Sequence, residues 1–111
     1  MNHLEEIISE IKKYRNNIIF KKHALVRILE RKIAPELVKN HLENPDKLVD
    51  AILQKSENIN EKKYKLLFEL SKNRKLAVIV VLKEENLYVV TVFIKYKKWD
   101  KMVRKWPRKY R

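Results

Sequence analysis

The spacing of hydrophobic residues changes along the chain near residue 48. Before that point apolar residues recur every three or four positions, as on one side of a helix. After it they form short runs or alternate singly, as in strands. The pattern predicts an α+β domain with two to three N-terminal helices, followed by a four-stranded antiparallel meander. We expect the helices to cover one face of the sheet.

Residues 76–96 should form the centre of that sheet. They hold two apolar, β-branched runs separated by Lys83-Glu84-Glu85-Asn86. Each run is too short to cross a bilayer and too apolar for an exposed strand. We therefore expect two central antiparallel strands joined by a short turn. Thr91 is the one aliphatic hydroxyl of the second run. It is either simply a good strand former or part of a site.

Two further strands are expected upstream. Residues 64–70 alternate, with Tyr64, Leu66, Phe68 and Leu70 facing one way. Residues 48–55 form a short apolar run that fits either a strand or a helix, and we favour the strand. Residues 18–20 are expected to be a short extended piece.

The first helix, near residues 4–16, should cover a sheet face, with partner binding as the alternative. On the second helix, near 23–32, Leu25, Ile28 and Leu29 are expected to pack. The opposite side carries His23, Arg27 and Arg31, because positions i, i+4 and i+8 stack on a helix. The third helix should begin at Pro35 and end before Asn44-Pro45, with His41 at its packed edge.

The 111-residue chain contains neither glycine nor cysteine. Its length indicates one domain over 1–111. Without glycine, asparagine is the residue expected where the backbone needs a positive φ. Without cysteine, disulfides and thiolate metal sites are excluded, which is compatible with a reducing compartment such as the cytoplasm. No apolar run is long enough to span a membrane.

The chain is strongly basic, with 27 Lys and Arg against 14 Asp and Glu, a net charge of +13. Such a surface attracts polyanions, chiefly nucleic acid, and favours an acidic protein partner. Residues 97–111 form a basic tail with interleaved aromatic residues, which suits single-stranded nucleic acid. The candidate nucleic-acid contacts are Lys95, Lys97, Lys98, Trp99, Lys101, Arg104, Lys105, Trp106 and Arg108. Alternatively, the tail is a short helix that docks Trp99, Met102, Val103 and Trp106 on the domain.

Few residues offer catalytic chemistry. The chain has no HExxH, no glycine-rich phosphate loop and no nucleophile elbow, so we expect neither a metal nor a cofactor. RNA can be cleaved without a metal, by attack of its 2′-hydroxyl on the adjacent phosphate. His23 could transfer the proton, and Arg27 and Arg31 could bind the phosphate. Thr91, or a nearby tyrosine such as Tyr88, could add a hydrogen bond. A solvated helix face without a function is the alternative.

A family resemblance rests on His23-Ala24 followed by Arg27, on Arg31-Lys32-Ile33, and on Val90-Thr91-Val92-Phe93. Over residues 18–96 the chain resembles a family of small uncharacterised domains grouped with the RelE/ParE-like toxins, and more widely with metal-independent RNases of the barnase–colicin–RelE type. Members commonly have Arg-Gly-Ile where this chain has Arg31-Lys32-Ile33. The resemblance implies a RelE-like fold in which His23 transfers protons, Arg27 and Arg31 bind phosphate, and Thr91 supports them.

The expected function is therefore a metal-independent endoribonuclease in the cytoplasm, the toxin of a toxin–antitoxin pair. Its expected partners are RNA, including ribosome-bound mRNA, and an acidic antitoxin protein. The alternative is a non-catalytic nucleic-acid-binding domain. A third interpretation, a structural module whose charge serves only solubility, predicts no RNA affinity at high salt.

Overall fold

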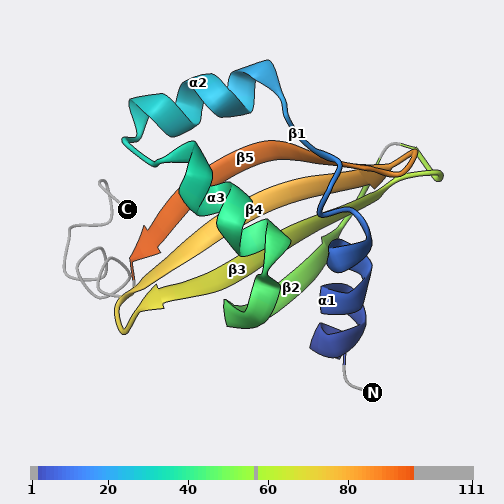
Figure 1. The fold of residues 1–111 in the computed structure, drawn as a ribbon, viewed down its shortest axis with the longest axis horizontal. Coiled ribbons are helices and arrows are strands. Elements are labelled where there is room, and N and C mark those ends of the chain that lie inside the picture. The colour runs from blue at the N-terminus through green and yellow to red at the C-terminus, as the bar shows by residue number, and fades with distance from the viewer. Residues whose placement is uncertain (1–2, 57, 97–111) are drawn as a thin grey trace, which may run out of the picture.

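The computed structural model describes residues 3–56 and 58–96. Its element order is helices, then strands, with one short strand inserted early (Figure 1). The elements are α1 (His3–Lys13), β1 (Ile18–Phe20), α2 (Lys22–Glu30), α3 (Pro35–Glu43), the 3₁₀ turn η1 (Pro45–Lys47), β2 (Leu48–Gln54), β3 (Lys62–Ser71), β4 (Arg74–Lys83) and β5 (Asn86–Tyr96). The α+β class and the strand at residues 48–55 are confirmed.

The sheet has five strands in the order β1-β5-β4-β3-β2 and is mixed (Figure 1). Strands β2 to β5 form the expected antiparallel meander, but β1 pairs in parallel with β5, from Ile18 opposite Leu87 to Phe20 opposite Val89. The prediction of four antiparallel strands was therefore wrong. A three-residue strand that pairs with a partner so distant in the sequence leaves no local periodicity to detect.

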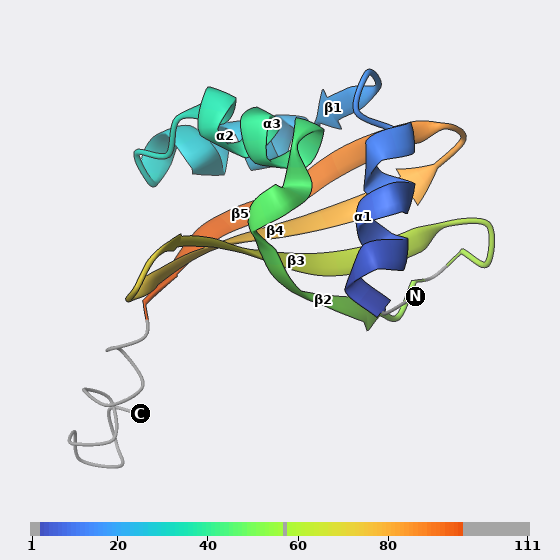
Figure 2. The ribbon, with the colours of Figure 1, turned by 60° about the horizontal axis from the view of Figure 1, so that its bottom comes forward.

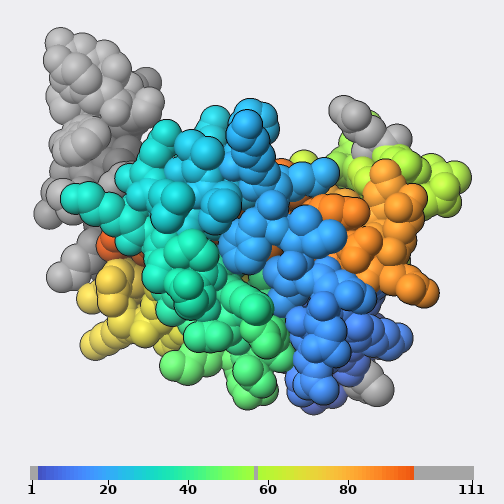
Figure 3. All heavy atoms as spheres, turned by 45° about the horizontal axis from the view of Figure 1, so that its top comes forward, coloured from blue at the N-terminus to red at the C-terminus, as the bar shows by residue number. Residues whose placement is uncertain are grey.

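All three helices bury residues against the same face of the sheet (Figure 2). In the space-filling view, their blue to green atoms cover much of the side that faces the viewer (Figure 3). They insert Ile7 and Ile11 from α1, Ala24 and Ile28 from α2, and Val38 and Leu42 from α3. The strands contribute every second residue to this core, among them Leu66, Phe68, Val78, Val80 and Val89. The opposite face, which we call the open face, is covered by no helix among the described residues (Figure 2).

The packing side of α2 differs from the sequence prediction. Ile28 is buried as expected, but its neighbours on the buried side are not Leu25 and Leu29, which are 39% and 59% exposed. Instead, Ala24 is fully buried on the same side of the helix as Ile28. A small side chain suits a position where a helix packs closely on a sheet. His41, in contrast, packs as predicted: its ring meets that of Phe68 edge-on at 5.4 Å.

The turn between β4 and β5 consists of Glu84 and Glu85, flanked by the paired residues Lys83 and Asn86. Both glutamates have positive φ, 51° and 66°, as a two-residue type I′ turn requires. Lys32 is the third such residue, and no described asparagine adopts this conformation. The expectation that asparagine would serve there was therefore wrong. Asparagines support the turn instead, since the Asn17 and Asn86 amides donate to the carbonyls of Glu85 and Glu84.

The outer edge of β2 is partly blocked by two polar side chains. The Asp50 carboxylate accepts from the Ala51 N–H at 2.9 Å, and the His3 ring lies 3.2 Å from the Ala51 carbonyl. These contacts occupy backbone groups that would otherwise pair with another strand.

Two side chains of β3, Lys62 and Tyr64, have shifted pKa values where the strand meets α1. Lys62 lies 3.2 Å from Glu10, and this hydrogen-bonded pair raises the pKa of Lys62. Burial, followed by the negative charge of Glu10, raises the pKa of the neighbouring Tyr64. Both groups hold their protons more tightly in the folded chain than in the unfolded one.

We predict that replacing the turn by Asn-Gly, in the variant Glu84→Asn/Glu85→Gly, raises the free energy of unfolding by about 1–2 kcal/mol, because left-handed backbone is costly for glutamate. Urea unfolding measures it. The matched control is Lys72→Asn/Asn73→Gly in the β3–β4 turn, where neither residue has positive φ. An equal gain in both variants would contradict the explanation.

Stability should also fall at alkaline pH. Because the folded-state pKa values of Lys62 and Tyr64 are raised, their contribution is complete below pH of about 10 and is lost as the pH rises through the folded values. Urea unfolding measured between a pH of about 8 and a pH of about 11 tests this prediction. Tyr64→Phe should flatten the alkaline loss and Tyr14→Phe should not; identical profiles for both variants would refute the assignment.

Candidate nucleic-acid interface

Helix α2 lies along β5, next to the sheet edge that β1 forms (Figure 1). It starts directly from the strand pairing, because the Lys21 N–H just before it donates to the Val89 carbonyl at 3.1 Å. Ala24 and Ile28 then anchor the helix in the core. The start of α2 is thereby fixed relative to β5, and so are the side chains that the helix presents.

His23 and Arg27 lie one helical turn apart on α2, and both are exposed as predicted. Each directly precedes one of the buried anchors, Ala24 and Ile28. Neither side chain makes a hydrogen bond or ion pair with another described residue. The pair therefore presents an imidazole and a guanidinium to solvent, about 6 Å apart along the helix axis, and both remain available to a ligand.

Arg31 ends α2 in a Schellman motif. The Ile33 N–H donates to the Ile28 carbonyl at 2.9 Å and the Lys32 N–H to the Leu29 carbonyl at 3.1 Å. Lys32 has a φ of 57° at the position of the Schellman motif where glycine is usual, so this chain adopts the left-handed conformation there without glycine. The motif turns the chain sharply and leaves Arg31 beside β5.

The Arg31 guanidinium donates a hydrogen bond to the backbone carbonyl of Val92. Val92 lies beyond Val89, the last residue of β5 that β1 pairs with. Arg31 therefore binds the β5 edge where strand pairing has ended. It also lines a hollow of about 460 Å³ together with Ile33, Phe93, Ile94 and Tyr96. Among the predicted phosphate binders, Arg31 is thus already engaged by the protein, and Arg27 is not.

Thr91 lies on the open face, beside an irregularity in β5. Ile79 pairs with Thr91 but Val80 pairs with Val89, so Val90 is an extra, unpaired residue. The extra residue keeps Val89 and Val92 both in the core and directs Thr91 and Phe93 away from it. No hydrogen bond joins Thr91 to His23, Arg27 or Arg31. The structure brings Arg31 to β5, at the residue next to Thr91, but joins Thr91 to none of the other three predicted residues by a hydrogen bond.

The open face combines aromatic rings with lysines. The Lys65 ammonium lies 5.5 Å from the centre of the Phe93 ring, and the Lys21 ammonium lies 4.6 Å from that of Tyr88. Phe93 is two residues from Thr91 and therefore on the same face. Aromatic rings flanked by cations can stack on bases while the cations meet phosphates.

The sequence pattern suggested Tyr88 only as a hydrogen-bond donor and gave no signal for Lys21, Lys65 or Phe93 as ligand contacts. The alternation of 64–70 placed Lys65 opposite the core side, but its meeting with Phe93 depends on the register of three strands. Of the predicted tail contacts, only Lys95 lies in the described chain, as an exposed residue near the end of β5. The other predicted contacts lie outside the described residues; they are Lys97, Lys98, Trp99, Lys101, Arg104, Lys105, Trp106 and Arg108.

Residues 3–56 and 58–96 contain no cluster of three or more His, Asp or Glu side chains placed to hold a metal ion. Within the same residues, no helix has the length and apolar character needed to cross a membrane.

Comparison with known proteins gives one match. The profile of the domain of unknown function DUF4258 matches residues 20–94, from the end of β1 to near the end of β5. The chain belongs to this family. The DUF4258 region contains α2, the Schellman motif and the open face, whereas α1 precedes it. No curated protein and no solved structure matches the chain.

The two arginines of α2 should differ in their effect on stability. Arg31→Ala should lower the free energy of unfolding by about 1 kcal/mol, since it removes a hydrogen bond from a charged donor to Val92. Arg27→Ala should change it by less than about 0.5 kcal/mol, because Arg27 is exposed and makes no such bond. Urea unfolding of both variants decides; equal losses would contradict the role given to Arg31.

Proposed function

We propose that this DUF4258 protein binds RNA along β5 and cleaves it without a metal, as a RelE-like ribonuclease. The observation that carries the proposal is the exposed pair His23 and Arg27 on α2, which makes no hydrogen bond or ion pair with another described residue. The aromatic rings and lysines of the open face support it as a surface for RNA. The net charge of +13 supports a polyanionic ligand.

In the proposed reaction, the 2′-oxygen of a nucleotide attacks the adjacent phosphorus while the bond to the 5′-oxygen breaks. The 2′-hydroxyl loses a proton, the 5′-oxygen gains one, and the products are a 2′,3′-cyclic phosphate and a 5′-hydroxyl. His23 transfers one of these protons, since imidazole titrates near neutral pH, and water serves at the other position. Arg27 binds the phosphate oxygens, whose negative charge grows during the reaction.

Arg31 and Thr91 take supporting roles in the proposal. Arg31 fixes the end of α2 to β5, and it lines the hollow beside Phe93 with further N–H groups in its guanidinium. Thr91 offers a hydroxyl on the open face, where it can bind RNA without touching His23. We further propose that the protein acts in the cytoplasm as the toxin of a toxin–antitoxin pair. An acidic antitoxin would bind this basic surface, and the RNA substrate would include ribosome-bound mRNA.

A non-catalytic RNA-binding domain is the second candidate function. Two observations favour it. The Arg31 guanidinium already donates a hydrogen bond to the Val92 carbonyl, and Thr91 makes no hydrogen bond with His23 or Arg27. In that case the stacking rings and cations would bind RNA while His23 contributes little, since a neutral histidine adds little to phosphate affinity.

Cleavage of a labelled single-stranded RNA in EDTA tests the proposal. His23→Ala should lower the cleavage rate by about 10²–10⁴-fold and Arg27→Ala by about 10²–10³-fold, the usual losses for a proton-transfer group and a charge-stabilising donor. His3→Gln and Arg15→Gln are the matched controls and should cleave at the wild-type rate.

Products ending in a 2′,3′-cyclic phosphate, lost in both site variants, are the expected result. Cleavage that persists in His23→Ala would refute the assignment of His23. RNA binding without cleavage, both on free RNA and on translating ribosomes, would favour the second candidate.

A further inference from the structure

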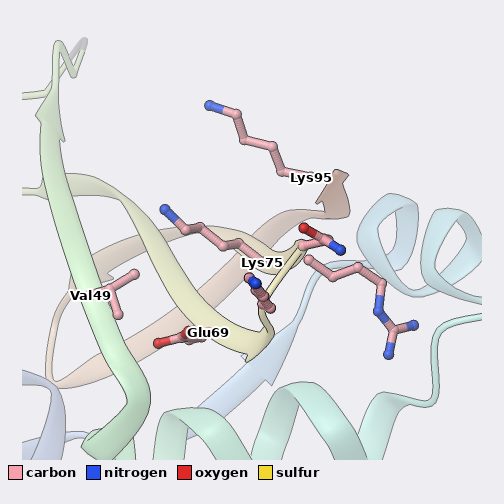
Figure 4. Close-up of a pocket in the computed structure, with 7 residues that line it drawn as sticks. Val49, Glu69, Lys75 and Lys95 are labelled. Atoms are coloured by element: carbon pink, nitrogen blue, oxygen red, sulfur yellow. The ribbon is translucent and has the colours of Figure 1, made fainter. Parts of the chain in front are cut away.

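The β3–β4 turn and the end of β5 enclose a basic hollow of about 430 Å³ on the molecule, which we call the hairpin pocket (Figure 4). It is lined by Val49, Glu69, Lys72, Asn73, Arg74, Lys75 and Lys95. Four of these residues are cationic and one is anionic. The pocket lies at the opposite end of β5 from the start of α2, because β5 runs from Asn86 near β1 to Tyr96.

Two lysines of the pocket lie directly opposite each other. Lys75 on β4 pairs in register with Lys95 on β5, and Figure 4 shows both side chains extending in a similar direction from adjacent strands. Like charges in such cross-strand pairs are destabilising. The protein therefore holds two positive charges together at a cost in stability.

Glu69 does not neutralise this pair. It lies opposite Lys75 on β3, yet the two side chains form no ion pair, and neither do Glu69 and Lys95. In Figure 4 the Glu69 carboxylate points toward Val49 on β2 instead. Among the described residues, no other acid lines the pocket, so its positive charge is available to an anion.

We infer that the hairpin pocket binds a backbone phosphate of RNA through Lys75 and Lys95, outside the site of His23 and Arg27. The inference rests on the proposed RNA-binding function and extends it to a second contact point. The phosphate oxygens accept hydrogen bonds from the two ammonium groups and replace the repulsion between them with attraction.

The open face favours RNA over an acidic peptide as the ligand. Lys95 lies two residues beyond Phe93 on the same face, roughly 7 Å along the strand. A phosphate at Lys95 would therefore place a neighbouring base within reach of the Phe93 ring, whose other neighbour is the cation of Lys65. An acidic peptide supplies carboxylates but no flat bases for that ring.

The test measures binding of a labelled 2′-O-methyl oligouridine, which cannot be cleaved by 2′-oxygen attack. The variant Lys75→Gln/Lys95→Gln removes both cations, and Lys12→Gln/Lys13→Gln, at the exposed end of α1, is the control with the same change in charge. Anisotropy titrations over a range of salt concentrations give the affinity and its salt dependence. Thermal unfolding checks that the pocket variant is folded; it should be at least as stable as wild type, since the repulsion is gone.

The pocket variant should bind about tenfold more weakly than wild type, the loss expected for charge-assisted hydrogen bonds to one phosphate. The slope of log K against log salt should fall in magnitude by about 0.7, the value for one phosphate contact on a single strand. The control should lose less affinity than the pocket variant. A pocket variant that binds like the control would overturn the inference, as would equal competition by polyglutamate of matched charge.

The binding test of the hairpin pocket and the cleavage test of the proposed function can fail independently of each other. If His23→Ala abolishes cleavage while the pocket variant binds like the control, the ribonuclease stands and the pocket fails. If no form of the protein cleaves RNA while the pocket variant binds weakly, the pocket stands and catalysis fails. Wild-type protein that does not bind the oligonucleotide at all would refute both.

Discussion

The pairing of β4 with β5 is the interaction on which the rest of the structure depends. Strand β4 places Leu76, Val78, Val80 and Leu82 in the core, and β5 adds Leu87, Val89 and Val92 from the other side of the same turn. The helices pack against these residues, and β1 and β3 pair with the two outer edges of the hairpin. The hairpin forms without glycine, so Glu84 and Glu85 adopt a backbone conformation that is costly for them. The apolar burial on both strands outweighs that cost.

The extra residue Val90 determines what the outer surface presents. Side chains alternate along a strand, so without the extra residue the part of β5 beyond Val90 would turn its other side to the core. Val92 would then leave the core, and Thr91 and Phe93 would enter it. The irregularity thus preserves the apolar core on one side and exposes a hydroxyl and an aromatic ring on the other. The candidate interface and the core are consequences of the same register.

Arg31 connects the fold to the candidate site. Its hydrogen bond to Val92 holds the end of α2 to the part of β5 that β1 does not reach. This contact fixes the orientation of the helix that presents His23 and Arg27. We therefore expect a substitution at Arg31 to affect both stability and the proposed activity, and substitutions at His23 and Arg27 to have little effect on the fold.

Much of the fold could be predicted because its signals are local. The alternation in β3, the two apolar runs of β4 and β5, and Pro35 at the start of α3 each depend on neighbouring residues. The parallel pairing of β1 and the extra residue Val90 could not be predicted, since both depend on partners far away in sequence. The exposed placement of His23 and Arg27 followed from helix geometry, but the buried side of α2 was misjudged because Ala24 is less hydrophobic than Leu25 or Leu29. The meeting of Lys65 with Phe93, and of Lys75 with Lys95, required the register of the sheet.

The central claim is that RNA lies along β5, from the start of α2 to the hairpin pocket. Titration of isotope-labelled protein with the uncleavable oligouridine, followed by backbone amide chemical shifts, tests it most directly. The account predicts that the shifts concentrate in α2, in β5 and in the β3–β4 turn, while α1 stays unchanged and β2 responds only near Val49, which lines the hairpin pocket. Shifts centred on α1 or β2, with β5 unaffected, would contradict it.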